Sequence, residues 1–580
     1  MIKRLLGCVR EYKLPSIITL LLMVGEVVIE CFIPFITSNL INQMKLGIEM
    51  SKLLTIGLSL VLMAVVSLCC GGIAAYTCAK ASAGFAKNLR KDIFNKIQEY
   101  SFKNIDKFSS SSLVTRLTTD VNNVQMAYMM LIRIAVRSPL MFIFAIIMAY
   151  IMGGALATTF VVVIPVMVFG LIIITRKAMP AFHSVFKKYD KLNESVEENV
   201  RAMRVVKGFS REEYEKEKFS KAADNICMDF TKAERIVAFN GPLMQICLYF
   251  NVLFVLTVGS NLIITNGGTT LGVGQISAML TYGMQILMSL MTLSMIYVMI
   301  TISYESMKRV YEVLTEESTI KNPENPVTEV KDGSLDFENV NFKYSENSQK
   351  YALSDVNIHI ESGMTVGVIG GTGSSKSSLV QLIPRLYDVS EGEVKVGGVN
   401  VKDYDLKVLR DNVAMVLQKN LLFSGTIKEN LKWGNENATD EEMIEACKLS
   451  QADDFVRSFP DGYDTHIEQG GTNVSGGQKQ RLCIARALLK KPKILILDDS
   501  TSAVDTKTDA MIRAGFKKFI PETTKIIIAQ RISSVQDADM IIVMENGAVS
   551  AYGNHSELMD KSEIYREIYE QQTSGGDSDE

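Results

Sequence analysis

The chain has 580 residues, a formal net charge of −3 and 47% hydrophobic residues. This length exceeds what one hydrophobic core usually serves, so we expect more than one domain. The near-neutral charge gives no reason to expect a nucleic-acid partner, and the nine cysteines include no Cys-x-x-Cys pair that would indicate a metal site.

The first 13 residues predict an amphipathic helix that lies on the membrane surface. They are basic, and no small-residue cleavage pattern of a secretory signal follows them. Their apolar residues recur at helical spacing: Ile2, Leu5, Leu6, Val9 and Tyr12. We therefore assign residues 1–13 to a surface helix and residues 14–312 to a transmembrane domain.

Four stretches of the transmembrane domain are long and nearly free of charge. A bilayer core ~30 Å thick needs about 20 apolar residues in a helix. Two stretches, residues 14–42 and 53–79, fit one span each. Residues 138–175 and 236–304 each fit two helices, joined by turns at Gly153 and Gly154 and at residues 265–268. The sequence therefore predicts six transmembrane helices.

Two long segments between these stretches, residues 80–137 and 176–235, are rich in Lys and Arg, whereas the two turns carry no charge. Positive charge marks the cytoplasmic side, so we place both segments and both termini there. Each segment is long enough for two helical arms, and ~25 helical residues rise about 37 Å. Stalks of this length are typical of a protein that couples its membrane part to a soluble motor.

After a connector at residues 313–336, strand and helix patterns alternate through residues 337–572, and we expect the acidic tail at 573–580 to be disordered. A buried-strand pattern at 365–369 runs into a Gly-rich loop and then a helix. This resembles the phosphate-binding loop, in which backbone N–H groups hold phosphate oxygens. The resemblance assigns ATP binding to Gly370, Gly371, Thr372, Gly373, Ser374, Ser375, Lys376, Ser377 and Ser378, with Lys376 on the outer phosphates and Ser377 on Mg²⁺.

A second buried strand, residues 493–497, ends in Asp498 and Asp499 and resembles the Walker B element, with Asp498 directed toward Mg²⁺. Between the two motifs lies a segment that resembles the signature of the ABC transporter superfamily: Ser475, Gly476, Gly477 and Gln478. Other motifs follow the order of that superfamily. They are Tyr344 for adenine stacking, Gln418 for the Q-loop and Mg²⁺, and the D-loop at residues 502–505, which ends in Asp505.

The membrane half also resembles the exporter type of this superfamily. Residues 102–116 and 205–209 are similar to the loops that carry its two coupling helices and dock on nucleotide domains. The resemblance implies a six-span α-helical domain followed by an α/β P-loop domain with a helical subdomain, in the cell membrane with the nucleotide domain in the cytoplasm. It further implies ATP and Mg²⁺ as cofactors, a second half-transporter as partner, and export of amphipathic small molecules, lipids or peptides.

Three residues depart from the pattern of the superfamily on the Walker side of the site. Ser375 replaces a Gly, Asp499 replaces the catalytic Glu, and Gln530 replaces the switch His. Asp is one methylene shorter than Glu, and a displacement of about 1 Å costs ~100-fold in rate. Gln cannot carry the charge or relay the proton of an imidazole. The pattern resembles the degenerate half of a heterodimeric exporter; the alternatives are a homodimer with low ATPase activity and an ATP-gated regulatory or channel-like subunit.

The membrane half contains candidate residues for the substrate path. Charges within spans are costly, so Glu26 and Glu30 indicate either recognition of cationic cargo or structural ion pairs with Arg133 and Arg137 at the start of the third helix. The sixth helix carries methionines on one face, which suits varied apolar ligands or ordinary packing. The candidates on this helix are Tyr282, Met284, Met288 and Met291, and Tyr297 is a further aromatic candidate.

Overall fold

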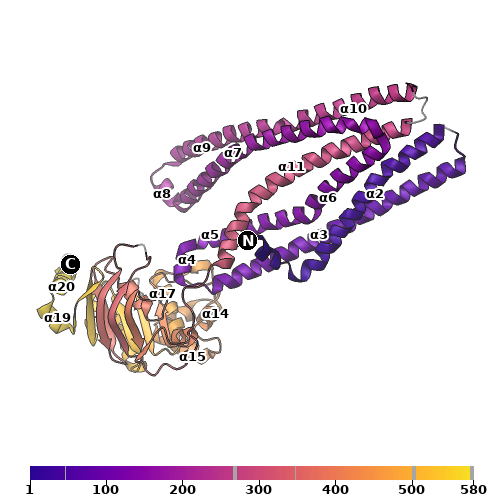
Figure 1. Ribbon diagram of the computed structural model, residues 1–580. Helices are drawn as coiled ribbons and strands as arrows, with labels where there is room; N and C mark the ends of the chain where they lie inside the picture. Colours follow the sequence, from indigo (N-terminus) through magenta and orange to yellow (C-terminus); the bar gives the residue numbers. More distant parts are fainter. Residues whose placement is uncertain (46, 266–270, 347, 500–503, 575–580) are drawn as a thin grey trace. The chain divides into compact units, whose positions relative to one another are not determined.

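The structure is a computed structural model that describes residues 1–45, 47–265, 271–346, 348–499 and 504–574 (Figure 1). The chain forms two compact units. The first contains Met1–Gln98 and Ser109–Glu316, and the second contains Glu99–Phe108 and Glu317–Glu580. The two units are described separately below.

The first unit is helical throughout its described residues. Long helices dominate it, with short ones at the N-terminus and at two turns. They are α1 (Ile2–Gly7), α2 (Lys13–Lys45), α3 (Met50–Gln98), α5 (Ser110–Thr115), α6 (Val121–Gly153), α7 (Thr159–Arg201), α8 (Met203–Gly208), α9 (Glu212–Ala238), α10 (Asn240–Thr265) and α11 (Val273–Thr315).

Within the described residues, six helical segments are long and apolar enough to cross a membrane, which confirms the number of spans predicted from the sequence. The predicted turn at Gly153 and Gly154 is present: α6 ends at Gly153, and Gly154 has a φ of 47°. The turn predicted at residues 265–268 falls largely outside the described residues. The cytoplasmic arms are continuous with the spans, because α3 and α7 extend far beyond their apolar stretches.

Three boundaries differ from the prediction. The N-terminal helix α1 ends at Gly7, and a short 3-10 turn, Arg10–Tyr12, leads into α2, so residues 1–13 are not one helix. Helix α6 begins at Val121, which places Arg133 and Arg137 inside the helix and not at its start. Helix α11 extends to Thr315 and the first strand begins at Leu335, so the connector is slightly shorter than residues 313–336.

Side-chain packing joins the transmembrane helices. In Figure 1, α2 lies alongside α3, and α7 lies alongside α9. Buried residues from α2, α6, α10 and α11 form one apolar cluster, which includes Val27, Ala149, Val255 and Met279. The helices of this unit therefore pack through apolar side chains, as expected for spans that must also face lipid.

The described residues of the second unit form two large sheets and a two-stranded antiparallel sheet, β7-β8. The larger has the strand order β12-β11-β3-β10-β9-β6, in which only β11 and β12 pair antiparallel, and an antiparallel sheet has the order β2-β1-β4-β5. The strands are β1 (Leu335–Phe342), β2 (Leu353–Ile360), β3 (Thr365–Gly370), β4 (Glu391–Val396), β5 (Val399–Asn400), β6 (Val413–Val416), β7 (Gly425–Thr426), β8 (His466–Ile467), β9 (Ile494–Asp498), β10 (Thr524–Ile528), β11 (Met540–Glu545) and β12 (Ala548–Gly553).

Helices cover these sheets, and a group of them between β6 and β9 forms the helical lobe that the sequence predicts around the signature segment. The helices are α4 (Phe102–Phe108), α12 (Lys376–Leu382), α13 (Leu406–Asn412), α14 (Ile427–Lys432), α15 (Asp440–Leu449), α16 (Asp453–Ser458), α17 (Gly476–Leu488), α18 (Thr506–Phe519), α19 (His555–Lys561) and α20 (Glu563–Ser574).

Helix α4 belongs to this second unit although it precedes the rest of the unit by more than 200 residues. The Tyr387 hydroxyl donates to the Asp106 carboxylate at 2.7 Å, and the Phe102 and Tyr387 rings lie with centroids 6.0 Å apart. The Asn104 side-chain amide donates to the Glu317 carbonyl at 3.1 Å. Residues 102–108, the first part of the predicted coupling segment 102–116, therefore pack on the fold of the nucleotide domain, whereas residues from Ser109 onward belong to the first unit.

Candidate functional site

Three of the motifs assigned to the nucleotide site lie at the carboxyl ends of three adjacent parallel strands. Strand β10 pairs with β3 on one side and with β9 on the other. Strand β3 leads into the Gly-rich loop, β9 ends at Asp498, and Gln530 follows β10 by two residues. Ligands of open α/β sheets bind at this edge, so the topology brings the motifs together.

The Gly-rich loop has a backbone that glycine suits. A side chain at Gly370 would meet the Met544 carbonyl oxygen at 2.2 Å, and Gly373 has a φ of 83°. Ser375 adopts the left-handed conformation, with φ 68° and ψ 26°, immediately before α12. This conformation strains any residue with a Cβ atom, so the backbone itself favours the Gly that the sequence resemblance expects at this position.

Lys376 lies over the loop from the first turn of α12. Its Nζ donates to the carbonyl oxygens of Gly370 at 2.8 Å and Gly371 at 2.9 Å. Burial lowers the pKa of the Lys376 ammonium, and the nearby Asp499 and Asp498 oppose this shift. The arrangement holds a positive charge against the Gly-rich loop at the start of α12, which suits a polyphosphate.

Ser377 and Asp498 form an oxygen pair next to this charge. The Ser377 hydroxyl donates to Asp498 Oδ1 at 3.0 Å. Burial raises the pKa of Asp498, and the hydrogen bond from Ser377 partly counters the increase. Mg²⁺ prefers such hard oxygen ligands and takes few from the protein when phosphates supply the rest. The two side chains therefore fit the metal of a Mg–nucleotide.

The two unusual residues Asp499 and Gln530 contact each other. The Gln530 Nε2 donates to Asp499 Oδ2 at 2.7 Å, and Asp499 has a φ of 49°. The Asp499 backbone N–H donates to the Ile528 carbonyl at 3.1 Å. This bond to the neighbouring strand β10 fixes the backbone position from which the Asp499 side chain extends. A carboxylate held by a neutral amide is a weak arrangement for activating water.

Tyr344 forms an aromatic surface beside the loop. Its hydroxyl shares a hydrogen bond with the Ser378 hydroxyl at 2.8 Å, and its ring is half exposed. The Tyr344 ring centroid lies 4.8 Å from that of Phe342 and 5.2 Å from that of Tyr387, both edge to face. These two ring contacts hold Tyr344 in the position expected for stacking on a base. The sequence analysis missed Tyr387, since no motif marks it.

The signature segment forms the N-terminus of α17. The Ser475 hydroxyl accepts from the Gln478 backbone N–H, and Gln478 Oε1 accepts from the Ser475 backbone N–H at 2.9 Å, which makes a complete capping box. Ser475 and Gly476 are exposed, and Gly477 is half-buried. A helix N-terminus of this kind attracts anions.

Two other predicted site residues lie at element ends. Gln418 is exposed in the segment that follows β6. The Asp505 carboxylate accepts from the Thr508 backbone N–H at 2.9 Å and caps α18, and this hydrogen bond lowers the pKa of Asp505. Residues 502 and 503 of the predicted D-loop lie outside the described residues. Thr372 and Ser374 lie in the loop, where the Ser374 side chain is buried.

The candidates in the membrane half do not gather at one place. Arg137 Nη2 lies 2.7 Å from Glu30 Oε1 and 3.4 Å from Glu26 Oε1, so the structural interpretation of these glutamates has the support of geometry. Tyr282 is fully buried, and its hydroxyl donates to the Cys31 carbonyl at 2.7 Å. On the same helix the side chains of Met284 and Met288 are exposed and Met291 packs beside an apolar cluster.

Two protein-family models match the chain, one over its apolar first half and the other within its second half, where strand and helix patterns alternate. Residues 16–321 match the ABC transporter transmembrane region, and residues 353–502 match the ATP-binding family described as ABC transporter. The first match covers the six candidate spans, and the second includes the Gly-rich loop, the signature segment and Asp498.

Similar proteins extend over almost the full chain. The ABC transporter ATP-binding protein YfiB of Bacillus subtilis is 35% identical over 570 residues, which cover 98% of each chain. The protein Rv1273c of Mycobacterium tuberculosis is 30% identical and covers 97% of this chain and 96% of its own. A solved structure of a bacterial Atm1-family ABC exporter with ATP bound has a TM-score of 0.81 at 24% identity, over 97% of this chain and 98% of that chain.

Proposed function

Because this chain belongs to the ABC transporter family and joins a six-span transmembrane region to an ATPase domain, we propose that it is the degenerate-site subunit of a heterodimeric exporter. As a half-transporter it needs a second half, and the coupling of ATP to transport is a property of the family. In this proposal the complex moves amphipathic small molecules, lipids or peptides out of the cytoplasm, and the partner is a different chain.

One observation carries the proposal: the signature segment of this ATPase domain keeps the pattern of the superfamily, whereas the Walker side of the nucleotide site does not. We call these two parts the signature edge and the Walker edge. The signature edge keeps a complete capping box between Ser475 and Gln478. On the Walker edge the catalytic position holds Asp499, bonded to Gln530 where a His would stand. An intact signature is useful to a partner's site, whereas the Walker edge favours slow hydrolysis.

The proposed roles follow from these positions. Tyr344 stacks on the adenine, the loop amides and Lys376 hold the phosphates, and Ser377, Asp498 and Gln418 ligate Mg²⁺. Ser475, Gly476, Gly477 and Gln478 close on the ATP held by the partner, and Asp505 lies at the boundary between the two nucleotide domains. The closure of the two domains drives the stalks toward outward opening, and hydrolysis resets them.

The test compares phosphate release by the purified chain alone and by the chain with a half-transporter that carries Glu after its Walker B Asp and His at its switch. We expect slow turnover alone and roughly 100-fold faster turnover by the pair. In the pair, Ser475→Ala should abolish most turnover, while Asp499→Asn should leave it nearly unchanged.

Brisk turnover by the chain alone would overturn the heterodimer and indicate a homodimer. A pair that hydrolyses ATP without accumulating any amphipathic compound against a gradient would favour the ATP-gated regulatory or channel-like subunit. An equal loss of turnover in Ser475→Ala and Asp499→Asn would contradict the proposed division between the two edges.

A further inference from the structure

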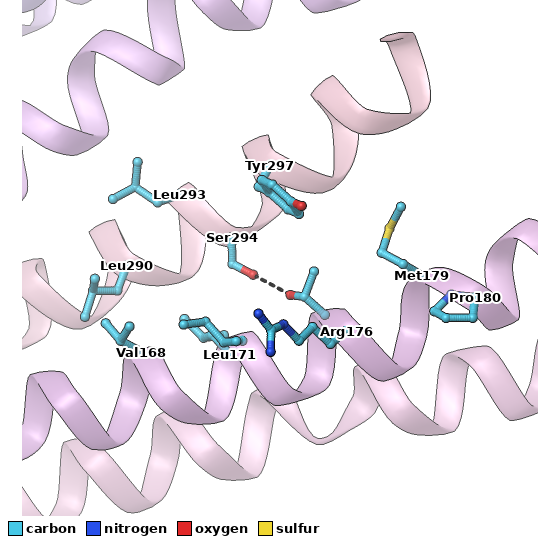
Figure 2. Close-up of a pocket in the computed structure, with 11 residues that line it drawn as sticks. Val168, Leu171, Arg176, Met179, Pro180, Leu290, Leu293, Ser294 and Tyr297 are labelled. Atoms are coloured by element: carbon cyan, nitrogen blue, oxygen red, sulfur yellow. Dashed lines mark hydrogen bonds between the residues drawn. The ribbon is translucent and has the colours of Figure 1, made fainter. Parts of the chain in front are cut away.

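A cavity of about 850 Å³ lies in the transmembrane unit between α7 and α11 (Figure 2). This volume falls within the range of roughly 300–1,000 Å³ that is usual for pockets holding one small organic molecule. It is lined by Val168, Leu171, Ile172, Thr175, Arg176, Met179, Pro180, Leu290, Leu293, Ser294 and Tyr297. Of the candidates that the sequence analysis names for the substrate path, Tyr297 lines this cavity. The others do not: Glu26, Glu30, Tyr282, Met284, Met288 and Met291.

The lining is mostly apolar and has one polar group of four side chains, Thr175, Arg176, Ser294 and Tyr297, with Met179 and Pro180 beyond it on α7. Val168 and Leu171 on α7 and Leu290 on α11 line an apolar part of the cavity. About a turn further along the same helices, polar groups follow, and the Thr175 and Ser294 hydroxyls form a hydrogen bond of 3.5 Å between α7 and α11. A ligand with an apolar chain and a polar head matches this arrangement better than a uniformly apolar one.

The charged residue in the polar part of the cavity determines which charge a ligand's head group should carry. Arg176 is the one charged residue of the lining, which contains no Asp or Glu. Among the residues that the structure describes, Arg176 forms no ion pair with a carboxylate, whereas Arg137 is paired with Glu30. Figure 2 shows Arg176 on α7 and Tyr297 on α11 on the two sides of the cavity.

We propose that this cavity binds an amphipathic anion, whose apolar chain lies against Val168, Leu171 and Leu290 and whose carboxylate or phosphate head binds Arg176. The Arg176 guanidinium offers charge-assisted hydrogen bonds to such a head, and the hydroxyls of Thr175, Ser294 and Tyr297 add donors beside it. A cationic amphiphile would bring its charge against Arg176 and bind worse. The inference rests on the proposed transport function, for which it names the substrate class.

A competing role for Arg176 is that of a boundary residue, since cytoplasmic ends of spans are rich in Lys and Arg. Lys177 is its immediate neighbour and shares that boundary, but it does not line the cavity. Lys177→Gln is therefore the matched control for Arg176→Gln. It removes the same charge from the same depth of the membrane and leaves the cavity unchanged.

The experiment measures equilibrium binding of a dansyl-labelled fatty acid, its methyl ester and a dansyl-labelled alkyl amine to the full chain in nanodiscs of phosphatidylcholine, which carries no net charge. We expect the acid to bind at least tenfold more tightly than the ester or the amine, as one charge-assisted contact would provide. Arg176→Gln should bind the acid no better than the ester, Arg176→Lys should keep part of the preference, and Lys177→Gln should match the wild type.

Binding of a Mg-nucleotide is measured in the same samples. It shows that each variant is folded, and it separates the two proposals. Retained nucleotide binding without any preference for the acid would overturn only the anion site, as would an equal loss in Lys177→Gln and Arg176→Gln. Preference for the acid together with a failure to bind Mg-nucleotide would overturn the proposed function and leave the anion site standing.

Discussion

The side chains of Gln530 and Asp499 are hydrogen-bonded to each other, with the amide Nε2 2.7 Å from Asp499 Oδ2. The bond joins two of the three positions that the sequence resemblance identifies as departures from the pattern of the superfamily. A Gln side chain is long enough to reach the Asp499 carboxylate, and its hydrogen bond occupies one of the two carboxylate oxygens. The two departures therefore act as a unit, and their effects on catalysis should not be additive.

The first prediction concerns substitutions of Asp499 and Gln530. The double change Asp499→Glu and Gln530→His should raise the ATPase rate of the purified chain roughly 100-fold. It lengthens the carboxylate side chain by one methylene and places a titratable imidazole beside it. Each single change should give much less than half of this gain on a logarithmic scale. Phosphate release by wild type, both single variants and the double variant measures the coupling. Equal, additive gains would show that the contact has no catalytic consequence.

The second prediction concerns the backbone at Ser375. Since its φ of 68° is left-handed, Ser375→Gly should stabilise the nucleotide domain by about 0.5–1 kcal/mol, the relief of strain less the greater freedom of Gly in the unfolded chain. Ser375→Ala keeps the Cβ and removes the hydroxyl. It should therefore leave the strain in place. Thermal unfolding of the three proteins separates backbone from hydroxyl effects, and equal stabilisation by Ala and Gly would contradict the strain argument.

The parts of this fold that the sequence predicted are those with local signals. The Gly-rich loop and signature segment each lie within one short stretch of chain, and uncharged runs mark spans directly. Arg137 was misplaced at a helix start because charge was taken as a boundary. In fact, Glu30 on another helix pairs with it and makes a charge inside α6 tolerable. Arg176 and Ser294 are 118 residues apart, and only helix packing brings them to one cavity.

The third prediction is a pH dependence at Asp498. Burial raises the pKa of Asp498 in the folded protein, so the folded state holds this proton more firmly than the unfolded state does. Its contribution to stability is therefore lost as pH rises from the unfolded aspartate pKa of ~3.9 through the raised folded value. Asp498→Asn should remove that loss, raise the melting temperature of the nucleotide-free protein at neutral pH, and abolish the further rise caused by Mg-ATP.

Melting curves across this pH range, with and without Mg-ATP, provide the measurement for Asp498. Asp388 serves as a control, because it is a carboxylate of the same domain that is bonded to Arg385 and lies outside the strand ends. Asp388→Asn should lower stability and leave the response to Mg-ATP intact. A lower melting temperature for Asp498→Asn would show that ionised Asp498 does not destabilise the free domain.

The fourth prediction tests how α4 is held. The Tyr387 hydroxyl donates to Asp106 at 2.7 Å, and a hydrogen bond to a charged group contributes about 1.5–3 kcal/mol. Tyr387→Phe removes the hydroxyl but keeps the ring beside Tyr344, so amide exchange in α4 should become at least ~10-fold faster while nucleotide affinity stays within about twofold. Tyr351→Phe is the control, since its hydroxyl contacts Glu391 on the exposed surface. Unchanged exchange in Tyr387→Phe would show that other contacts hold α4.

The last prediction concerns the charges within the spans. Arg137 lies against both Glu30 and Glu26, so Arg137→Gln leaves two carboxylates without their cation, whereas Glu30→Gln leaves Arg137 with Glu26. Arg137→Gln should therefore lower the melting temperature more than Glu30→Gln. The double variant Arg137→Gln with Glu30→Gln should recover part of the melting temperature that Arg137→Gln loses. Because the glutamates serve this pairing, Glu26→Gln should impair transport of a cationic and a neutral dye equally. Selective loss of the cationic dye would instead make Glu26 a recognition residue.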